Sequence, residues 1–178
     1  MRRRLILLVA LLLLLVVVVA APASAGEDKP INGKMELALE LEWCGVPGDS
    51  PFVTWVGTVV IDGVTYGWAD FPTAPDPVFE KKFMYFEEYW TIFTLDPGQT
   101  PTVALACNPG LVVLDGFNDG RGTPGGAASA EGTVASAADP GPFADVAEGS
   151  RMFWRGKVTN LKGAGDEFKA TLHIHPLK

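Results

Sequence analysis

Alternation of apolar and polar residues is clearest near the two ends of the chain. Between residues 34 and 43 every second residue is apolar, and most of the residues between them are charged. Segments 150–161 and 167–175 repeat this period of two, which is typical of strands with one face in a core and the other in water. We therefore expect three strands here, with Met152 and Trp154 facing inward in the second and Phe168, Ala170, Leu172 and Ile174 in the third.

Asp62-Gly63 lies between two runs rich in Val, Ile and Thr. This dipeptide tolerates the positive φ angles of a type I′ turn and predicts a hairpin between strands 52–61 and 64–71. Further strands are expected at 83–95, with a bulge at Glu87-Glu88, and at three other apolar stretches. A proline-rich loop at 72–77, a glycine-rich loop at 116–126 and one helical turn within 141–149 complete the prediction. The three other strands are 102–107, 111–115 and 127–137.

Eight or nine short strands with frequent turn signals, and no long helical periodicity, predict an all-β domain. A sandwich and a barrel both fit this pattern. We favour an antiparallel β-barrel of about eight strands, because closure removes the exposed strand edges.

The N-terminus has the three parts of a secretory signal peptide, which we expect to be a helix preceding the barrel. Three arginines precede an unbroken apolar run from Leu5 to Ala21, and small residues follow, with Ala23 and Ala25 at positions −3 and −1 of the expected cut. The prediction is a signal peptide at 1–25 and a single β-barrel domain at 26–178. The alternative is an uncleaved anchor, since the run approaches the length that spans a bilayer.

Charge and cysteine content fit a secreted protein, either extracellular or periplasmic. Loss of the three arginines with the signal peptide changes the net charge from −7 to −10. This charge argues against nucleic acid and anionic membranes as partners, and cleavage would leave no stable membrane anchor. Cys44 and Cys107 are the only cysteines. In an oxidising compartment we expect them to form one disulfide, worth about 4 kcal/mol; a catalytic thiol is the alternative, without supporting spacing.

No metal or cofactor pattern is complete. His173 and His175 share a strand face, as metal ligands do, but no acidic ligand follows them and Lys169 lies on the same face. If the first and last strands pair, the acidic face of the first would lie beside these residues, and outward cross-strand Glu–His and Glu–Lys pairs would explain them. The segment 115–126 resembles a calcium loop, but Phe117 and Gly126 stand where oxygen ligands belong. We therefore predict no cofactor and no metal.

Acidic residues are the remaining candidates for chemistry. On a regular strand, Glu87 and Glu88 would face opposite sides, and one would be an inward carboxylate with a raised pKa. The interpretation we favour is that the expected bulge exposes both to water. Asp70 and Asp115, which lie near strand ends, leave the same two alternatives open.

Aromatic residues are the candidates for ligand binding. We predict Trp55, Phe86, Trp90 and Trp154 as ligand-binding residues, because a barrel of this size either holds one small ligand or is filled by its own side chains. A filled core is the alternative. The further aromatic residues that would line such a cavity are Trp68, Phe93 and Phe153.

Residues 107–158 carry a succession of motifs. Leu-Val-Val-Leu-Asp-Gly is followed by a glycine-rich stretch, Glu-Gly-Thr-Val-Ala-Ser-Ala, Gly-Pro-Phe-Ala and Arg-Met-Phe-Trp-Arg-Gly-Lys-Val. This succession resembles secreted bacterial proteins of the allene oxide cyclase and dirigent barrel superfamily. The resemblance implies an eight-stranded barrel with a central cavity for a hydrophobic molecule. It implies no catalytic residue, since no catalytic position of that superfamily maps onto this chain.

Three functions follow as hypotheses. The first is non-catalytic binding of an apolar small molecule or an envelope component. The second is an isomerase- or cyclase-like enzyme acting on a hydrophobic substrate in the barrel, which an inward carboxylate would favour. The third is a structural or protein-interaction module, which an exposed aromatic patch including Phe79 and Phe143 would favour. The oligomeric state and the ligand stay open.

Overall fold

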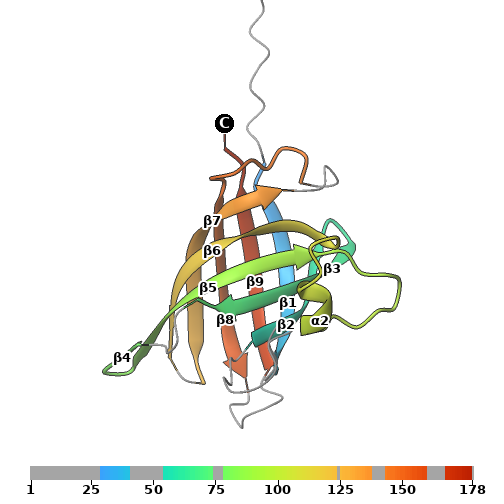
Figure 1. The fold of residues 1–178 in the computed structure, drawn as a ribbon. Helices are drawn as coiled ribbons and strands as arrows, with labels where there is room; N and C mark the ends of the chain where they lie inside the picture. Colours follow the sequence, from blue (N-terminus) through green and yellow to red (C-terminus); the bar gives the residue numbers. More distant parts are fainter. Residues whose placement is uncertain are drawn as a thin grey trace, which may run out of the picture.

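The chain folds into an antiparallel β-barrel. A computed structural model describes residues 29–40, 54–73, 78–123, 125–137, 143–159 and 167–177. These residues form one nine-stranded sheet in the order β3-β2-β1-β9-β8-β7-β6-β5-β4, which pairing of β3 with β5 closes into an eight-stranded barrel with β4 as an extra strand (Figure 1). The prediction of an all-β barrel of about eight strands is confirmed. The signal-peptide segment lies outside the described residues.

The bounds of the last two strands follow the prediction closely, whereas the first strand begins three residues earlier than predicted, at Ile31 and not at Lys34. The strands are β1 (Ile31–Glu40), β2 (Thr54–Ile61), β3 (Val64–Pro72), β4 (Val78–Glu80), β5 (Phe83–Phe93), β6 (Val112–Gly122), β7 (Ala127–Ala137), β8 (Arg151–Thr159) and β9 (Glu167–His175), and the short helix α2 (Val103–Ala106) lies between β5 and β6.

The first and last strands of the barrel, β1 and β9, lie next to each other. β1 pairs with β9 over eight residue pairs, and Lys169 donates to Glu36 across the seam at 3.2 Å. Both side chains are exposed, so the ion pair contributes little to stability. The hairpin at Asp62-Gly63 is also confirmed, since both residues have positive φ angles of 49° and 80°.

The predicted strand at 102–107 is wrong, because a helix forms there. The hydroxyl of Thr102 accepts a hydrogen bond from the Leu105 N–H and caps the first turn. Val103 and Ala106 then become buried against Ala69, Phe71 and Phe93 on the outside of the barrel. Burial of these two residues at helical spacing outweighs the strand preference of a short apolar run.

The predicted loop at 116–126 is wrong up to residue 122. β6 continues through this stretch and pairs with β5 on one side and β7 on the other. Gly116 and Gly120 face the barrel interior, where an added Cβ would meet the rings of Trp90 and Phe86 respectively. The glycines therefore make room for aromatic rings in a strand and do not mark a turn.

The predicted bulge at Glu87-Glu88 is also wrong. Glu87 pairs with Asp119 and Glu88 with Asn118 in an unbroken register, and the irregularity falls between Ile92 and Phe93. Because the strand is regular, the two carboxyl groups face opposite sides of the barrel wall. Glu87 is exposed and Glu88 is buried.

Residues 143–150 differ from the expected helical turn. In the described part of this region, from residue 143 onwards, there are turns but no helix. Phe143 is buried against Tyr66 at a ring distance of 5.5 Å and belongs to the core, so its predicted place in an exposed aromatic patch is wrong. Phe79, on the unpredicted strand β4, is 64% exposed, as expected.

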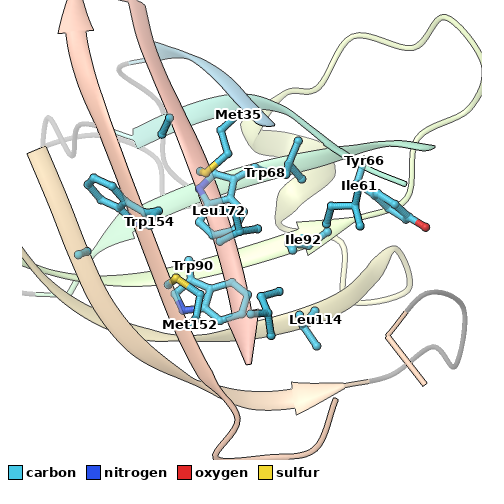
Figure 2. Close-up of a cluster of buried hydrophobic side chains, with 14 of the residues drawn as sticks. Met35, Ile61, Tyr66, Trp68, Trp90, Ile92, Leu114, Met152, Trp154 and Leu172 are labelled. Atoms are coloured by element: carbon cyan, nitrogen blue, oxygen red, sulfur yellow. The ribbon is translucent and has the colours of Figure 1, made fainter. Parts of the chain in front are cut away.

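Apolar side chains line the inside of the barrel. Figure 2 shows side chains from several strands, among them Met35, Trp68, Trp90 and Leu172, converging on its inside. A smaller apolar cluster lies outside, between the wall and α2. No helix in the described residues is long and apolar enough to cross a membrane.

Of the predicted disulfide, only one half lies in the described part of the chain. Cys107 follows α2 as its C-cap and is not a free thiol. Cys44 lies outside the described residues, so its pairing with Cys107 stays a prediction.

We expect Gly116→Ala to destabilise the fold by about 2 kcal/mol, because the new methyl group would collide with the backbone oxygen of Thr133 and lie 2.7 Å from the Trp90 ring. Urea unfolding monitored by tryptophan fluorescence measures this loss. Gly110→Ala is the control, since its nearest neighbour would be Asn108 Oδ1 at 3.3 Å. Equal stability of the two variants would show that the inward glycines are not needed for packing.

Candidate functional site: a buried carboxyl cluster

Three polar side chains on adjacent strands face the barrel interior: Asp70 on β3, Glu88 on β5 and Asn118 on β6. Their exposed fractions are only 2%, 9% and 3%. Asn118 lies directly opposite Glu88 in the β5–β6 register. Asp70 lies opposite Trp90, two residues along β5, so Asp70 and Glu88 are diagonal neighbours on the same face. We call these three residues the carboxyl cluster.

Strand alternation places each member of the cluster. On β5, Glu88 falls between Phe86 and Trp90, and all three side chains face inward. On β3, Asp70 follows Tyr66 and Trp68 at the same spacing. Counting in twos from the Asp62-Gly63 turn therefore finds Asp70. Asn118 was missed, because the glycines around it predicted a loop.

The cluster is short of hydrogen-bond partners. Within the described part of the chain, Asp70 Oδ1, Glu88 Oε2 and both amide atoms of Asn118 are buried without one. The indole nitrogens of Trp68 and Trp90, which face the same interior, are also unpartnered. Each such group costs about 1–3 kcal/mol, so the cluster lowers the stability of the barrel.

Burial changes the acidity of both carboxyl groups. It raises the pKa of Asp70 from 3.8 to about 7, and the Trp68 side chain opposes part of this change. Burial also raises the pKa of Glu88 well above its ordinary value; the charge of Asp70 adds to the shift and Asn118 opposes it. The shift brings the pKa of Asp70 close to neutral pH, and in Glu88 it favours the protonated form over the charged one.

Aromatic rings surround the cluster. Trp68 and Trp90 stack with ring centroids 5.3 Å apart and an interplanar angle of 4°. Phe86 stacks on Trp154 at 5.9 Å, and Phe168 contacts both Trp154 and Trp55, at 5.1 and 5.7 Å. Phe168 thus links Trp55 to the stacked pair of Phe86 and Trp154. Trp90 stacks on Trp68 in a separate pair. Ligand binding by Trp55, Phe86, Trp90 and Trp154 stays a prediction.

The two ends of the barrel differ. Near the C-terminus, Phe143 and Val146 are buried in the core, and Ser150 Oγ accepts a hydrogen bond from the Leu177 N–H at 3.1 Å, so this segment covers that end. At the other end, β2 begins and β1 ends (Figure 1). Trp55, near the start of β2, is half-buried. Phe86 is also half-buried. It stacks on Trp154, which contacts Phe168, and Phe168 in turn contacts Trp55.

Several other predicted positions lie elsewhere. Phe153 is on the outer face, stacked on His173, and Phe93 belongs to the cluster outside the barrel, so neither lines the interior as predicted. His173 pairs with Asn32, and no three His, Cys, Asp or Glu residues in the described segments are grouped as metal ligands. Asp115 accepts a 2.9 Å hydrogen bond from the Tyr89 hydroxyl on the half-buried outer face.

Comparison of the chain with protein-family models, with curated proteins and with solved structures gave no match. The resemblance to the allene oxide cyclase and dirigent barrels therefore stays a prediction.

We expect the barrel to lose stability as pH rises from about 4 to about 7. Across this window the unfolded chain has already released the Asp70 proton while the folded chain still holds it, so rising pH favours unfolding. Asp70→Asn should reduce this slope, leaving the part that comes from Glu88, and should stabilise the fold at pH 8 by roughly 4 kcal/mol relative to its effect at pH 4.

Urea unfolding at a series of pH values measures this effect. Asp119→Asn on the outer face of β6 is the control and should keep the parent slope, since Asp119 is exposed. An unchanged slope in Asp70→Asn would mean that Asp70 is ionised in the folded protein at low pH.

Proposed function

We propose that the barrel binds an apolar small molecule in its interior, and that the carboxyl cluster holds the polar part of that molecule. The observation that carries this proposal is the set of buried polar atoms without partners at Asp70, Glu88 and Asn118. An apolar core of the same volume would be more stable than a polar cluster that is only partly satisfied. A ligand that supplies the missing hydrogen bonds would account for the cluster.

The surroundings support the apolar part of the proposal. The rings of Trp55, Phe86, Trp90 and Trp154, together with Phe168, lie on the inside of the wall around the cluster. Binding sites for small molecules combine such apolar walls with a few polar groups that fix orientation. Trp68 stacks on Trp90 and Phe86 stacks on Trp154, so these rings form two stacked pairs on the inside of the wall.

A second function is favoured by the two carboxyl groups. Burial raises the pKa of both carboxyl groups, to about 7 in Asp70, and the charge of Asp70 raises that of Glu88 further. Acids whose pKa values are shifted in this way are typical of enzymes that move protons. The alternative function is therefore an isomerase- or cyclase-like enzyme acting on a hydrophobic substrate inside the barrel.

Secretion belongs to the same proposal. The basic, apolar and small-residue regions of the N-terminus support export and cleavage after Ala25. Cys107 is not a free thiol, and Cys44 is the only other cysteine, which supports a disulfide formed in an oxidising compartment.

We expect native mass spectrometry of the protein, purified from a secreting host without reducing agent, to detect a bound small molecule. Asn118→Leu should lower its occupancy at least tenfold, since a tenfold change corresponds to the loss of about one hydrogen bond. Asp119→Leu, the next residue on β6 but on the outer face, should retain it. The denatured mass should match residues 26–178 less two hydrogens.

Protein that carries no small molecule, in the parent and in both variants, would contradict the binding proposal. The function would then rest on a surface such as the exposed β4, with Val78 and Phe79 at 60% and 64% exposure. That result favours the third hypothesis, a structural or protein-interaction module.

The enzyme alternative has its own test. If Asp70 acts as a base toward carbon, the molecule released after incubation in deuterium oxide gains deuterium, and Asp70→Asn reduces the gain at least 100-fold. Mass spectrometry of the extracted molecule measures the exchange. Asp119→Asn should leave the exchange unchanged. Binding without exchange in the parent protein would leave binding as the function.

A further inference from the structure

We infer that the molecule bound in the barrel is a neutral, apolar carbonyl compound whose oxygen accepts hydrogen bonds from the carboxyl cluster and the neighbouring indole groups. This inference rests on the proposed function and names the chemical class of its ligand. It follows from which buried polar atoms lack partners, and from their charges.

Hydrogen-bond donors outnumber acceptors among these atoms. The indole N–H groups of Trp90 and Trp154 are buried without an acceptor. Trp68 and the Asn118 amide also lack an acceptor in good geometry, although they lie close enough to Asp70 and Glu88 to oppose the rise in pKa of these groups. The unpartnered acceptors in the cluster are Asp70 Oδ1, Glu88 Oε2 and Asn118 Oδ1. Glu88 also acts as a donor while it is protonated. A complementary ligand must therefore supply acceptors.

The hydrogen-bond donors and charges around the site argue against two classes of ligand, amines and carboxylates. An ammonium group offers only donors, so it would leave the indole N–H groups unpaired. A carboxylate offers acceptors, but its charge would lie in the same low-dielectric interior as Asp70 and would be repelled. A carbonyl oxygen is neutral and can accept two hydrogen bonds.

The register indicates which groups would meet the oxygen. Glu88 lies directly opposite Asn118, and Trp90 is the next inward residue on β5, so their polar groups come from adjacent inward positions on two strands. Asp70 approaches the same place from β3. We therefore assign the carboxyl group of Glu88 as the hydrogen-bond donor to the carbonyl oxygen of the ligand.

The test compares three probes of one shape: 2-pentylcyclopentanone, pentylcyclopentane and 2-pentylcyclopentylamine. Dissociation constants are measured at pH 7 by tryptophan fluorescence on the mature protein after removal of any bound molecule. The ketone should bind at least tenfold more tightly than the hydrocarbon and the amine.

Variants at residues 87 and 88 test whether Glu88 causes the tighter binding of the ketone. Glu88→Leu should remove the advantage of the ketone over the hydrocarbon, whereas Glu88→Gln should keep most of it, because the amide still donates a hydrogen bond. Glu87→Leu, on the outer face of the same strand, should bind like the parent. Retention of the advantage in Glu88→Leu would overturn the role of Glu88.

The outcomes separate this inference from the proposed function. Equal binding of ketone and hydrocarbon would overturn the carbonyl class but leave a barrel that binds apolar molecules. Tighter binding of the amine would show an anionic site and would also overturn the inference. Failure of all three probes, with no molecule bound to the purified protein, would contradict both.

Discussion

Closure of the barrel is the constraint on which the rest of this structure depends. Pairing of β3 with β5 joins the two ends of an eight-strand sheet, and β4 is left outside the ring. Once the sheet is closed, the volume inside is fixed, and every inward residue must share it. Large rings such as Trp90 and Phe86 fit only because the strand beside them presents Gly116 and Gly120.

The same closure isolates the carboxyl cluster. A carboxyl group on an open sheet would remain in water, but Asp70 and Glu88 lie inside a ring of strands whose interior is mostly aromatic and aliphatic. Burial raises the pKa of both groups, and their proximity raises that of Glu88 further. The energetic disadvantage of the cluster and its suitability for binding or proton transfer thus have one physical origin, exclusion of water.

The outside of the barrel carries exposed ion pairs and a second apolar cluster. Glu36 and Lys169 pair across β1 and β9, and Glu131 lies 3.7 Å from Arg151 across β7 and β8. These pairs are exposed and contribute little to stability, so the specificity of the fold must come from the inward residues. α2 adds a second apolar cluster over β3 and β5, which shields part of the outer wall.

The sequence by itself determined the local features: the alternating strands β1, β8 and β9, the Asp62-Gly63 turn and the all-β class. These depend on side-chain spacing and turn geometry within a few residues. The tertiary structure decided the rest. Gly116 and Gly120 act as spacers, and β6 continues through them, only because aromatic rings from β5 face them. Glu88 is buried only because partners on both sides keep β5 regular. Asp70, Glu88 and Asn118 are far apart in sequence, and their meeting requires the register of three strands, which no local pattern encodes.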